Sequence, residues 1–250
     1  MFGFARSKLA RRIGLPWRGW LPGWRKIFIH IGTHKTGTTS LQNFLHEQRD
    51  LLVSSGILYP EVDAGFIAHH QVAWELRRDS RCYPPEGHIE NLFRQIRQST
   101  VQHILISSED FEYLSQYPKT IGDFVARLRR TEVEPIFVAF LRQGDSYLAS
   151  LALELGKHGM SQPLGWFQEE VAIHNRILVK EDWYFEFDQA RFAKQWSAAT
   201  GCSLILIDYD RCLATEGTIP TFLRLIGATS DLIARSRNAH WLNASPRTAK

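Results

Sequence analysis

Four short runs of apolar residues, rich in β-branched and aromatic side chains, recur along the 250-residue chain and constrain its fold more than any other feature. They cover residues 26–31 (K-I-F-I-H-I), 103–107 (H-I-L-I-S), 135–141 (P-I-F-V-A-F-L) and 203–207 (S-L-I-L-I). Continuous apolar runs of this length are typical of strands that are buried on both faces. Another short strand, ended by a proline, is predicted at 56–60 (G-I-L-Y-P).

Helical patterns lie between these strands. After the first strand, Leu41, Phe44 and Leu45 share one helical face. Further apolar spacings predict helices at about 66–79, 86–100, 118–130, 145–158, 165–179, 186–199 and 218–227. Strands that alternate with helices indicate a mostly parallel sheet with helices on both faces. We therefore expect a single α/β domain of P-loop type over residues 26–250.

The composition is that of a globular protein. Hydrophobic residues make up 44% of the chain and charged residues 22%, which is enough apolar material for one sizeable core. Cys82, Cys202 and Cys212 are too far apart in sequence to indicate a metal site, and an odd count gives no disulfide framework. No signal peptide or membrane-spanning stretch is visible in the sequence. We expect a cytoplasmic protein that needs no metal.

Residues 1–25 form a basic N-terminal segment. Seven Lys or Arg and no Asp or Glu occur in residues 1–26, together with Trp17, Trp20 and Trp24. One interpretation is peripheral contact with an anionic membrane or a polyanionic substrate, and the other is a basic leader without fixed structure. The net charge of the whole chain, +4, fits an anionic small-molecule ligand. We predict no nucleic-acid partner.

The loop at residues 32–40 (G-T-H-K-T-G-T-T-S) joins the first strand to a helix and has the composition of an anion site. Backbone N–H groups at such a turn, the helix dipole and several hydroxyls all favour a phosphate. Gly32 and Gly37 have the spacing of the nucleoside-triphosphatase loop, but Thr38 stands where that loop has its lysine. Lys35 lies two residues before the second glycine instead, which weakens a kinase or ATPase interpretation.

The run Lys35-Thr36-Gly37-Thr38-Thr39 resembles the K-[ST]-G-[ST]-T loop of sulfotransferases that use 3′-phosphoadenosine 5′-phosphosulfate (PAPS). The fuller run I-H-I-G-T-H-K-T-G-T-T-S-L-Q is similar to a group of bacterial sulfotransferase-like proteins. The resemblance implies that Lys35 contacts the bridging oxygen and the sulfuryl group. It also implies a cradle for the 5′-phosphate, formed by Thr36, Gly37, Thr38, Thr39 and Ser40.

A second motif also resembles that family. Arg142 ends the strand 135–141, and Ser150 follows eight residues later in the next predicted helix. In the family an Arg and a Ser at this spacing bind the 3′-phosphate of the donor, a task that suits the planar fork of a guanidinium. His34, inside the first loop, is expected to add hydrogen bonds to the donor. After transfer the product would be 3′-phosphoadenosine 5′-phosphate (PAP).

Sulfuryl transfer needs a general base near the acceptor. Glu109 is the first candidate because it follows the strand 103–107 and should open onto the same edge as the loop. The family uses a histidine at the corresponding strand end in many cytosolic members and a glutamate in other carbohydrate sulfotransferases. His69 and His70, at the start of a predicted helix, are the second candidates.

These patterns predict a sulfotransferase that moves a sulfuryl group from PAPS to a hydroxyl or amine, with a carbohydrate, glycan or lipid headgroup as acceptor. Two alternatives stay open: a P-loop kinase or hydrolase, and a nucleotide-binding protein without turnover. The second alternative stays open because the sequence departs from the family pattern near its C-terminus. Many members carry a basic, glycine-containing loop near the C-terminus that completes the 3′-phosphate site, and we find no copy. The available cations are Lys157, Arg235, Arg237, Arg247 and Lys250.

Overall fold

The computed structural model describes residues 10–13, 23–62, 65–142, 144–180 and 183–237, with only the backbone described for residues 10–13. The basic N-terminal segment therefore lies largely outside the described residues. Within the described residues, no helix is long and apolar enough to cross a lipid bilayer.

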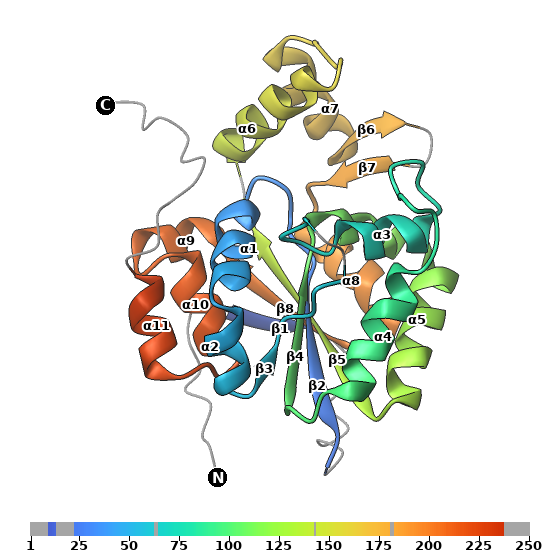
Figure 1. Ribbon diagram of the computed structural model, residues 1–250. Helices are drawn as coiled ribbons and strands as arrows, with labels where there is room; N and C mark the ends of the chain where they lie inside the picture. Colours follow the sequence, from blue (N-terminus) through green and yellow to red (C-terminus); the bar gives the residue numbers. More distant parts are fainter. Residues whose placement is uncertain (1–9, 14–22, 63–64, 143, 181–182, 238–250) are drawn as a thin grey trace.

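A six-stranded sheet forms the centre of the molecule (Figure 1). Its five neighbouring parallel strands, in spatial order, are β8 (Ser203–Asp208), β5 (Val133–Leu141), β2 (Arg25–His30), β4 (His103–Ser107) and β3 (Ile57–Leu58). The strand β1 (Ala10–Ile13) extends the sheet beyond β8 in the antiparallel direction. Because β2 pairs with both β4 and β5, three strand ends meet at one place on the carboxyl edge.

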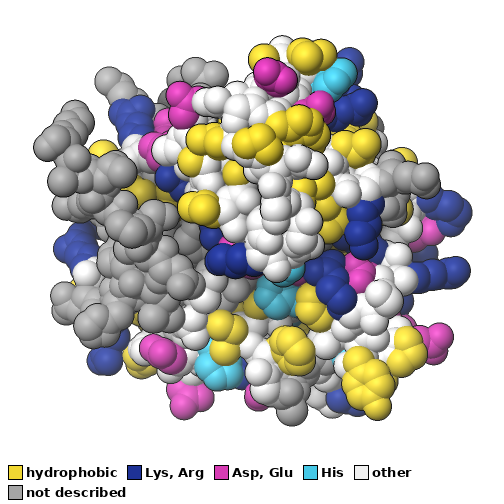
Figure 2. Space-filling view, turned by 90° about the horizontal axis from the view of Figure 1, so that it is seen from above, with side chains coloured by type: hydrophobic (Ala, Val, Ile, Leu, Met, Phe, Trp, Pro, Cys, Tyr) yellow, Lys and Arg dark blue, Asp and Glu magenta, His cyan; other side chains and the backbone are white. Residues whose placement is uncertain are grey.

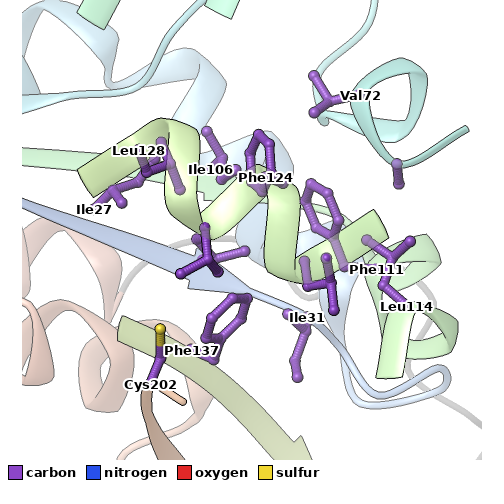
Figure 3. Packing of buried hydrophobic residues seen from close by; sticks show 14 of the residues in the cluster. Ile27, Ile31, Val72, Ile106, Phe111, Leu114, Phe124, Leu128, Phe137 and Cys202 are labelled. Carbon is purple, nitrogen blue, oxygen red and sulfur yellow. The ribbon is translucent and has the colours of Figure 1, made fainter. Parts of the chain in front are cut away.

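Helices cover both faces of this sheet (Figure 1). One face packs against α1 (Thr38–Glu47), α2 (Arg49–Ser54), α9 (Tyr209–Ala214), α10 (Thr218–Leu225) and α11 (Ser230–Ser236). The other face packs against α3 (His70–Arg77), α4 (His88–Gln98), α5 (Pro118–Arg130) and α8 (Gln189–Thr200). In the core on this second face, Phe124 and Leu128 of α5 lie over the strand residues Ile27 and Ile106 (Figure 3).

The remaining elements form a small unit above the carboxyl edge, which we call the cap (Figure 1). It consists of α6 (Gly144–Lys157), α7 (Leu164–His174) and a hairpin of β6 (Arg176–Lys180) and β7 (Trp183–Glu186). The cap has an apolar cluster of its own, in which Leu151, Phe167 and Phe185 are buried. That cluster includes Tyr113 from the 3-10 helix η1 (Glu109–Gln116), which follows β4 and so ties the cap to the sheet.

The fold class predicted from the sequence is confirmed as a mostly parallel α/β sheet flanked by helices on both faces. One prediction was wrong in part: the helix expected over 165–179 ends at His174, and residues 176–180 form β6. Asn175 has a left-handed backbone (φ 52°) and ends α7, after which the chain pairs with β7. The strand β1, within the expected N-terminal segment, was not predicted.

Candidate functional site

The loop between β2 and α1 is fastened to the end of β5. The backbone N–H of Thr33 donates to the carbonyl of Phe140 (2.9 Å), and the N–H of Phe140 donates to the carbonyl of Gly32 (2.7 Å). The Thr33 hydroxyl donates to the same Phe140 carbonyl at 3.1 Å. The loop therefore has a fixed position over the sheet edge, where polar side chains after β4 and β5 also lie.

The loop curves because three of its residues, Gly32 (φ 94°) and the two described next, have left-handed backbones. Lys35 has a φ of 61°, and Gly37, which precedes the first residue of α1, has a φ of 75°. Thr36, Thr38 and Ser40 are buried, whereas Thr39 is partly exposed. The Thr36 hydroxyl donates to the Thr33 carbonyl and so stabilises the loop itself. Successive N–H groups at such a curve, next to a helix N-terminus, make a concave surface suited to an oxyanion.

Arg142 brings the second motif to this loop. Its Nη1 donates to the carbonyl of Lys35 at 3.4 Å, its Nε lies 3.7 Å from Oδ1 of Asp210, and its guanidinium lies over the Tyr209 ring. The side chain is 14% exposed, and Nε makes no hydrogen bond to any described residue. Nε is itself buried, so this arrangement leaves one donor of the guanidinium unused.

Lys35 contacts α6, the helix that carries Ser150. The Lys35 ammonium donates to Oε2 of Glu154 at 3.3 Å. Residues four apart in a helix share a face, so Ser150, which is half-buried, lies on the side of α6 that faces the loop.

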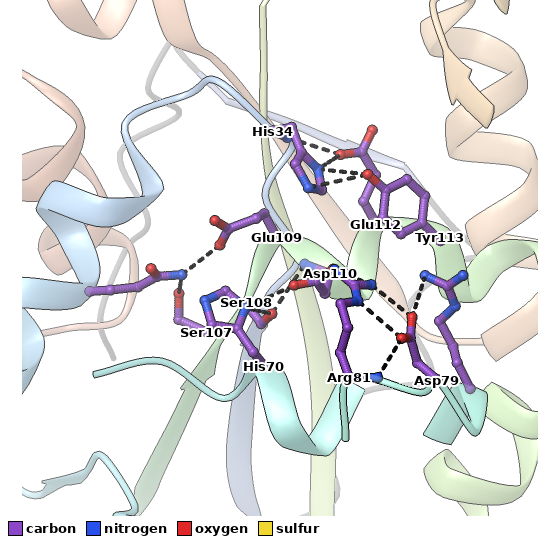
Figure 4. A network of polar contacts seen from close by, with 12 residues as sticks. His34, His70, Asp79, Arg81, Ser107, Ser108, Glu109, Asp110, Glu112 and Tyr113 are labelled. Carbon is purple, nitrogen blue, oxygen red and sulfur yellow. Dashed lines mark hydrogen bonds and ion pairs between the residues drawn. The ribbon is translucent and has the colours of Figure 1, made fainter. Parts of the chain in front are cut away.

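Glu109 lies directly against the loop at the start of η1. A Cβ atom added to Gly32 would be only 3.2 Å from its Cα. Its Oε2 accepts a hydrogen bond of 2.8 Å from Nε2 of Gln42, which belongs to α1 (Figure 4). Burial alone raises the pKa of Glu109, but His70, His34 and the Gln42 bond outweigh it, and the pKa is lowered. The carboxyl group is thus ionised near neutral pH, and the lowered pKa makes it a weaker base than an ordinary glutamate.

His70 faces Glu109 from the start of α3. Its Nδ1 lies 2.8 Å from the Ser108 hydroxyl and 3.0 Å from Oδ2 of Asp110, and Arg81 pairs with the other carboxylate oxygen at 3.2 Å (Figure 4). Burial alone lowers the pKa of His70, but the Asp110 hydrogen bond and the Glu109 charge raise it overall. With Nδ1 fixed on Asp110, Nε2 is the nitrogen left for chemistry.

His34 is held inside the loop by Glu112. Oε2 of Glu112 accepts from the His34 backbone N–H (2.9 Å) and lies 2.8 Å from Nδ1, and the Tyr113 hydroxyl lies 3.2 Å from both ring nitrogens. Burial alone lowers the pKa of His34, but Glu112, Glu109 and Asp110 outweigh it and raise the pKa. These contacts tie the loop to η1, and both ring nitrogens of His34 lie within hydrogen-bond distance of Tyr113.

His69 is bonded at both ring nitrogens to backbone groups. The Ser107 N–H donates to Nδ1 (3.1 Å), so the proton is on Nε2, which donates to the carbonyl of Pro60 (3.0 Å). Burial lowers the pKa of His69 to about 3, and only 2% of the residue is exposed. No nitrogen of His69 is left for an acceptor, and its role in this arrangement is to join β4 to the segment before α3.

Several functional candidates were not singled out from the sequence. Gln42, Arg81 and Glu154 reach the site through tertiary contacts, and Glu112 does so through the 3-10 turn after β4. Only Glu112 carried a signal, because it closely follows a strand end that was expected at the site.

The cations considered for the missing C-terminal loop divide into three groups. Arg235 pairs with Asp231 and Arg237 is exposed at the end of the described chain, whereas Arg247 and Lys250 lie outside the described residues. Lys157 bonds Glu154, the partner of Lys35. Seen from above, Lys, Arg and His side chains gather in the middle of the face beneath the cap (Figure 2). No group of three or more His, Cys, Asp or Glu in the described part of the chain could hold a metal ion.

Comparisons with known proteins add little. No protein-family model and no curated protein matches the chain. One solved structure, from a study of the PezAT chromosomal toxin-antitoxin system of Streptococcus pneumoniae, matches 62% of this chain and 67% of its own, with 17% sequence identity and a TM-score of 0.30. A likeness this low supports no inference about the present chain.

Proposed function

We propose that this chain is a sulfotransferase that transfers the sulfuryl group of PAPS to a hydroxyl or amine acceptor by in-line displacement. The observation that carries the proposal is the contact of Arg142 with the Lys35 carbonyl, which joins two motifs that are 107 residues apart in sequence. The pairing of β2 with β5 brings the ends of both strands together, and the support for one shared ligand is that each of the two stretches that meet there also resembles a donor motif of the same family. The donor would span them, with its 5′-phosphate on the loop and its 3′-phosphate at Arg142 and Ser150.

In this proposal the loop supplies the electrostatic stabilisation. Negative charge grows on the leaving 5′-phosphate as the bond to sulfur breaks, and the N–H groups of residues 36–40 and the Lys35 ammonium would meet that charge. Because these groups are held by the fixed loop and by α1, they need little reorganisation during the reaction.

Glu109 is the proposed base. Its carboxylate would take the proton of the attacking hydroxyl or amine while the acceptor oxygen or nitrogen attacks sulfur on the side opposite the leaving phosphate. Gln42 fixes one carboxylate oxygen, and the lowered pKa keeps the group ionised. His70 is the second candidate because Asp110 and Ser108 hold its Nδ1 and orient Nε2. The acceptor would enter between α3 and the cap and carry a sugar, glycan or lipid headgroup.

Calorimetric titration with PAP in the absence of magnesium tests the donor site. We expect micromolar binding to the native chain and losses of about tenfold or more in Lys35→Ala and Arg142→Ala, since each removes a charged phosphate partner. Lys119→Ala is the control, because Lys119 is exposed on α5 and pairs only with Asp123. If PAP does not bind and ATP binds with magnesium, the kinase or hydrolase alternative replaces this proposal.

Turnover of labelled PAPS tests the base. Glu109→Gln should bind PAP as the native chain does but lose about 100-fold or more in transfer to acceptors and in hydrolysis by water. An unchanged rate in Glu109→Gln with a loss in His70→Gln would assign the base to His70. A native chain that binds PAP but transfers to none of the carbohydrate, glycan and lipid acceptors tested, nor to water, would be a nucleotide-binding protein without turnover.

A further inference from the structure

Three basic side chains converge on one carboxylate at the junction of the loop and the cap. Oε2 of Glu154 accepts from the Lys35 ammonium at 3.3 Å and from the Lys157 ammonium at 2.8 Å. Its other oxygen, Oε1, lies 3.7 Å from Nε2 of His158. Lys157 and His158 are at the end of α6, whereas Lys35 comes from the phosphate loop, 119 residues away in sequence from Glu154.

An ordinary helix ion pair does not account for this arrangement. Ion pairs between a glutamate and a basic residue three or four positions later, such as those of Glu154 with Lys157 and His158, are common on exposed helices and stabilise them little. Here the same carboxylate oxygen also holds the one lysine of the phosphate loop, which is 28% exposed. An oxygen of sulfate or phosphate can accept the same charge-assisted hydrogen bonds from the two ammonium groups.

The face of α6 that carries these groups continues to the second donor motif. Ser150, Glu154 and Lys157 follow one another at helical spacing, and Arg142 lies just before the helix. A nucleotide bound across Lys35, Arg142 and Ser150 would lie along this face and bring its negative groups to Glu154. Two negative groups cannot share the same lysines at low cost, so the carboxylate would have to leave.

We propose that Lys35, Lys157 and His158 form an oxyanion subsite, which Glu154 fills in the nucleotide-free protein and which the sulfuryl group of the donor occupies after displacing Glu154. The identity of that group rests on the proposed function, whereas the subsite itself requires only a ligand with an oxyanion. Glu154 acts as a competitor that weakens donor binding and ties α6 to the loop until the donor arrives.

Binding of PAPS and PAP, measured by calorimetry at low ionic strength and without acceptor, tests the subsite. Glu154→Gln removes the competing charge and should tighten PAPS binding by about three- to tenfold, the scale of one partly exposed charge pair. Lys157→Gln should weaken PAPS binding by a similar factor. PAP lacks the sulfuryl group, so Lys157→Gln should change its affinity by less than about twofold, whereas Glu154→Gln should tighten PAP as well, because Lys35 also serves PAP. The matched ion pair on α5 gives the controls Lys119→Gln and Asp123→Asn, which should leave both affinities unchanged.

The outcomes separate this inference from the proposed function. If PAPS binds and depends on Lys35 but is unaffected by Glu154→Gln and Lys157→Gln, the subsite is wrong and the proposed function stands. If neither PAPS nor PAP binds the native chain, the proposed function fails, and inorganic pyrophosphate becomes the probe. Tightest pyrophosphate binding in Glu154→Gln and weakest in Lys157→Gln would keep the subsite as a general oxyanion site. The absence of that order would overturn it.

Discussion

Gly32 lets the loop at residues 32–40 lie closely against Glu109, the candidate base. Its φ is 94°, a left-handed value that favours glycine, and an added Cβ would lie 3.2 Å from the Glu109 Cα and 3.3 Å from its Cβ. The loop is held on its other side by hydrogen bonds to Phe140, so it cannot retreat from this overlap without breaking them. Only glycine lets the loop and η1 approach each other this closely.

Gly32→Ala should therefore destabilise the protein by more than the cost of placing alanine at a positive φ. Gly159, with a φ of 91° and no atom within 4 Å of an added Cβ, is the matched control. We expect Gly159→Ala to lower the free energy of unfolding by about 1–2 kcal/mol for the backbone conformation, and Gly32→Ala by about 1–3 kcal/mol more for the overlap. Urea denaturation of the two variants measures the difference. Equal losses would mean that Glu109 moves away freely.

Four histidines near the site respond to pH in opposite directions. Burial lowers the pKa of His30 to about 4 and that of His69 to about 3, below the value of roughly 6.5 for an exposed imidazole. Between those values the unfolded chain binds protons that the native protein does not, so both residues reduce stability as the pH falls below about 6.5. The raised pKa values of His34 and His70 instead give stability that is present at low pH and lost as pH rises through their folded values.

The variant His30→Asn isolates one of these effects. Asparagine keeps an amide within reach of Ser107, the partner of His30 Nδ1, but does not titrate. From pH 7 to pH 5, the native protein should lose about 2 kcal/mol of unfolding free energy relative to the variant, since 1.5 units of depressed pKa lie in that range. Urea denaturation at the two pH values gives the comparison. Parallel pH dependences would mean that His30 titrates normally in the folded chain.

At the scale of elements, α8 is fixed by a side-chain cap at its N-terminus. Asp188 precedes the helix and accepts hydrogen bonds from the backbone N–H groups of Ala190 (2.9 Å) and Arg191 (3.0 Å). The helix carries Trp196, whose side chain is fully buried and in ring contact with Phe137 of β5. The cap therefore satisfies two N–H groups of a helix that covers the centre of the sheet.

Replacing this cap should have a measurable cost. We expect Asp188→Ala to lower the free energy of unfolding by about 1 kcal/mol, because it leaves both N–H groups without their acceptor. Asp188→Ser, which restores an acceptor oxygen, should recover most of the loss. Chemical denaturation followed by tryptophan fluorescence measures both variants. A loss in Asp188→Ser as large as in Asp188→Ala would assign the effect of Asp188 to its charge.

The sequence predicts the elements whose formation depends on local pattern. The strand over 103–107 and the helix over 118–130 agree with the structure because their apolar periods are uninterrupted. The hairpin of β6 and β7 was not predicted, because R-I-L-V-K continues a helical pattern and only pairing with β7 makes it a strand. The candidate site divides in the same way. The residues of the loop at 32–40 could be predicted from their spacing in the sequence, whereas Gln42, Arg81 and Glu154 become site residues only through contacts across the fold.

At the scale of the whole molecule, the sheet has two different edges. On one side β3 has only two residues, and short edge strands resist pairing with another chain. On the other side β8 is one of the longer strands, and β1 covers its edge through residues 204–207. Without β1, the backbone groups of β8 on that side would be open to another molecule. The antiparallel strand thus completes a sheet whose candidate functional site lies at the ends of other strands.

Two truncations test this role. Removal of residues 1–13 deletes β1, whereas removal of residues 1–9 keeps it, so their difference measures the strand. We expect the shorter chain to lose about 2 kcal/mol of unfolding free energy relative to the longer one, the net value of a few backbone hydrogen bonds. It should also self-associate as its concentration rises, which light scattering detects. PAP affinity should be equal in the two truncations, because among the described strands β1 pairs with β8 alone, and the proposed donor motifs lie after β2 and β5. Equal unfolding free energies and equal masses in solution for the two truncations would mean that the β8 edge needs no cover. A difference in PAP affinity would mean that β1 also affects the proposed donor site.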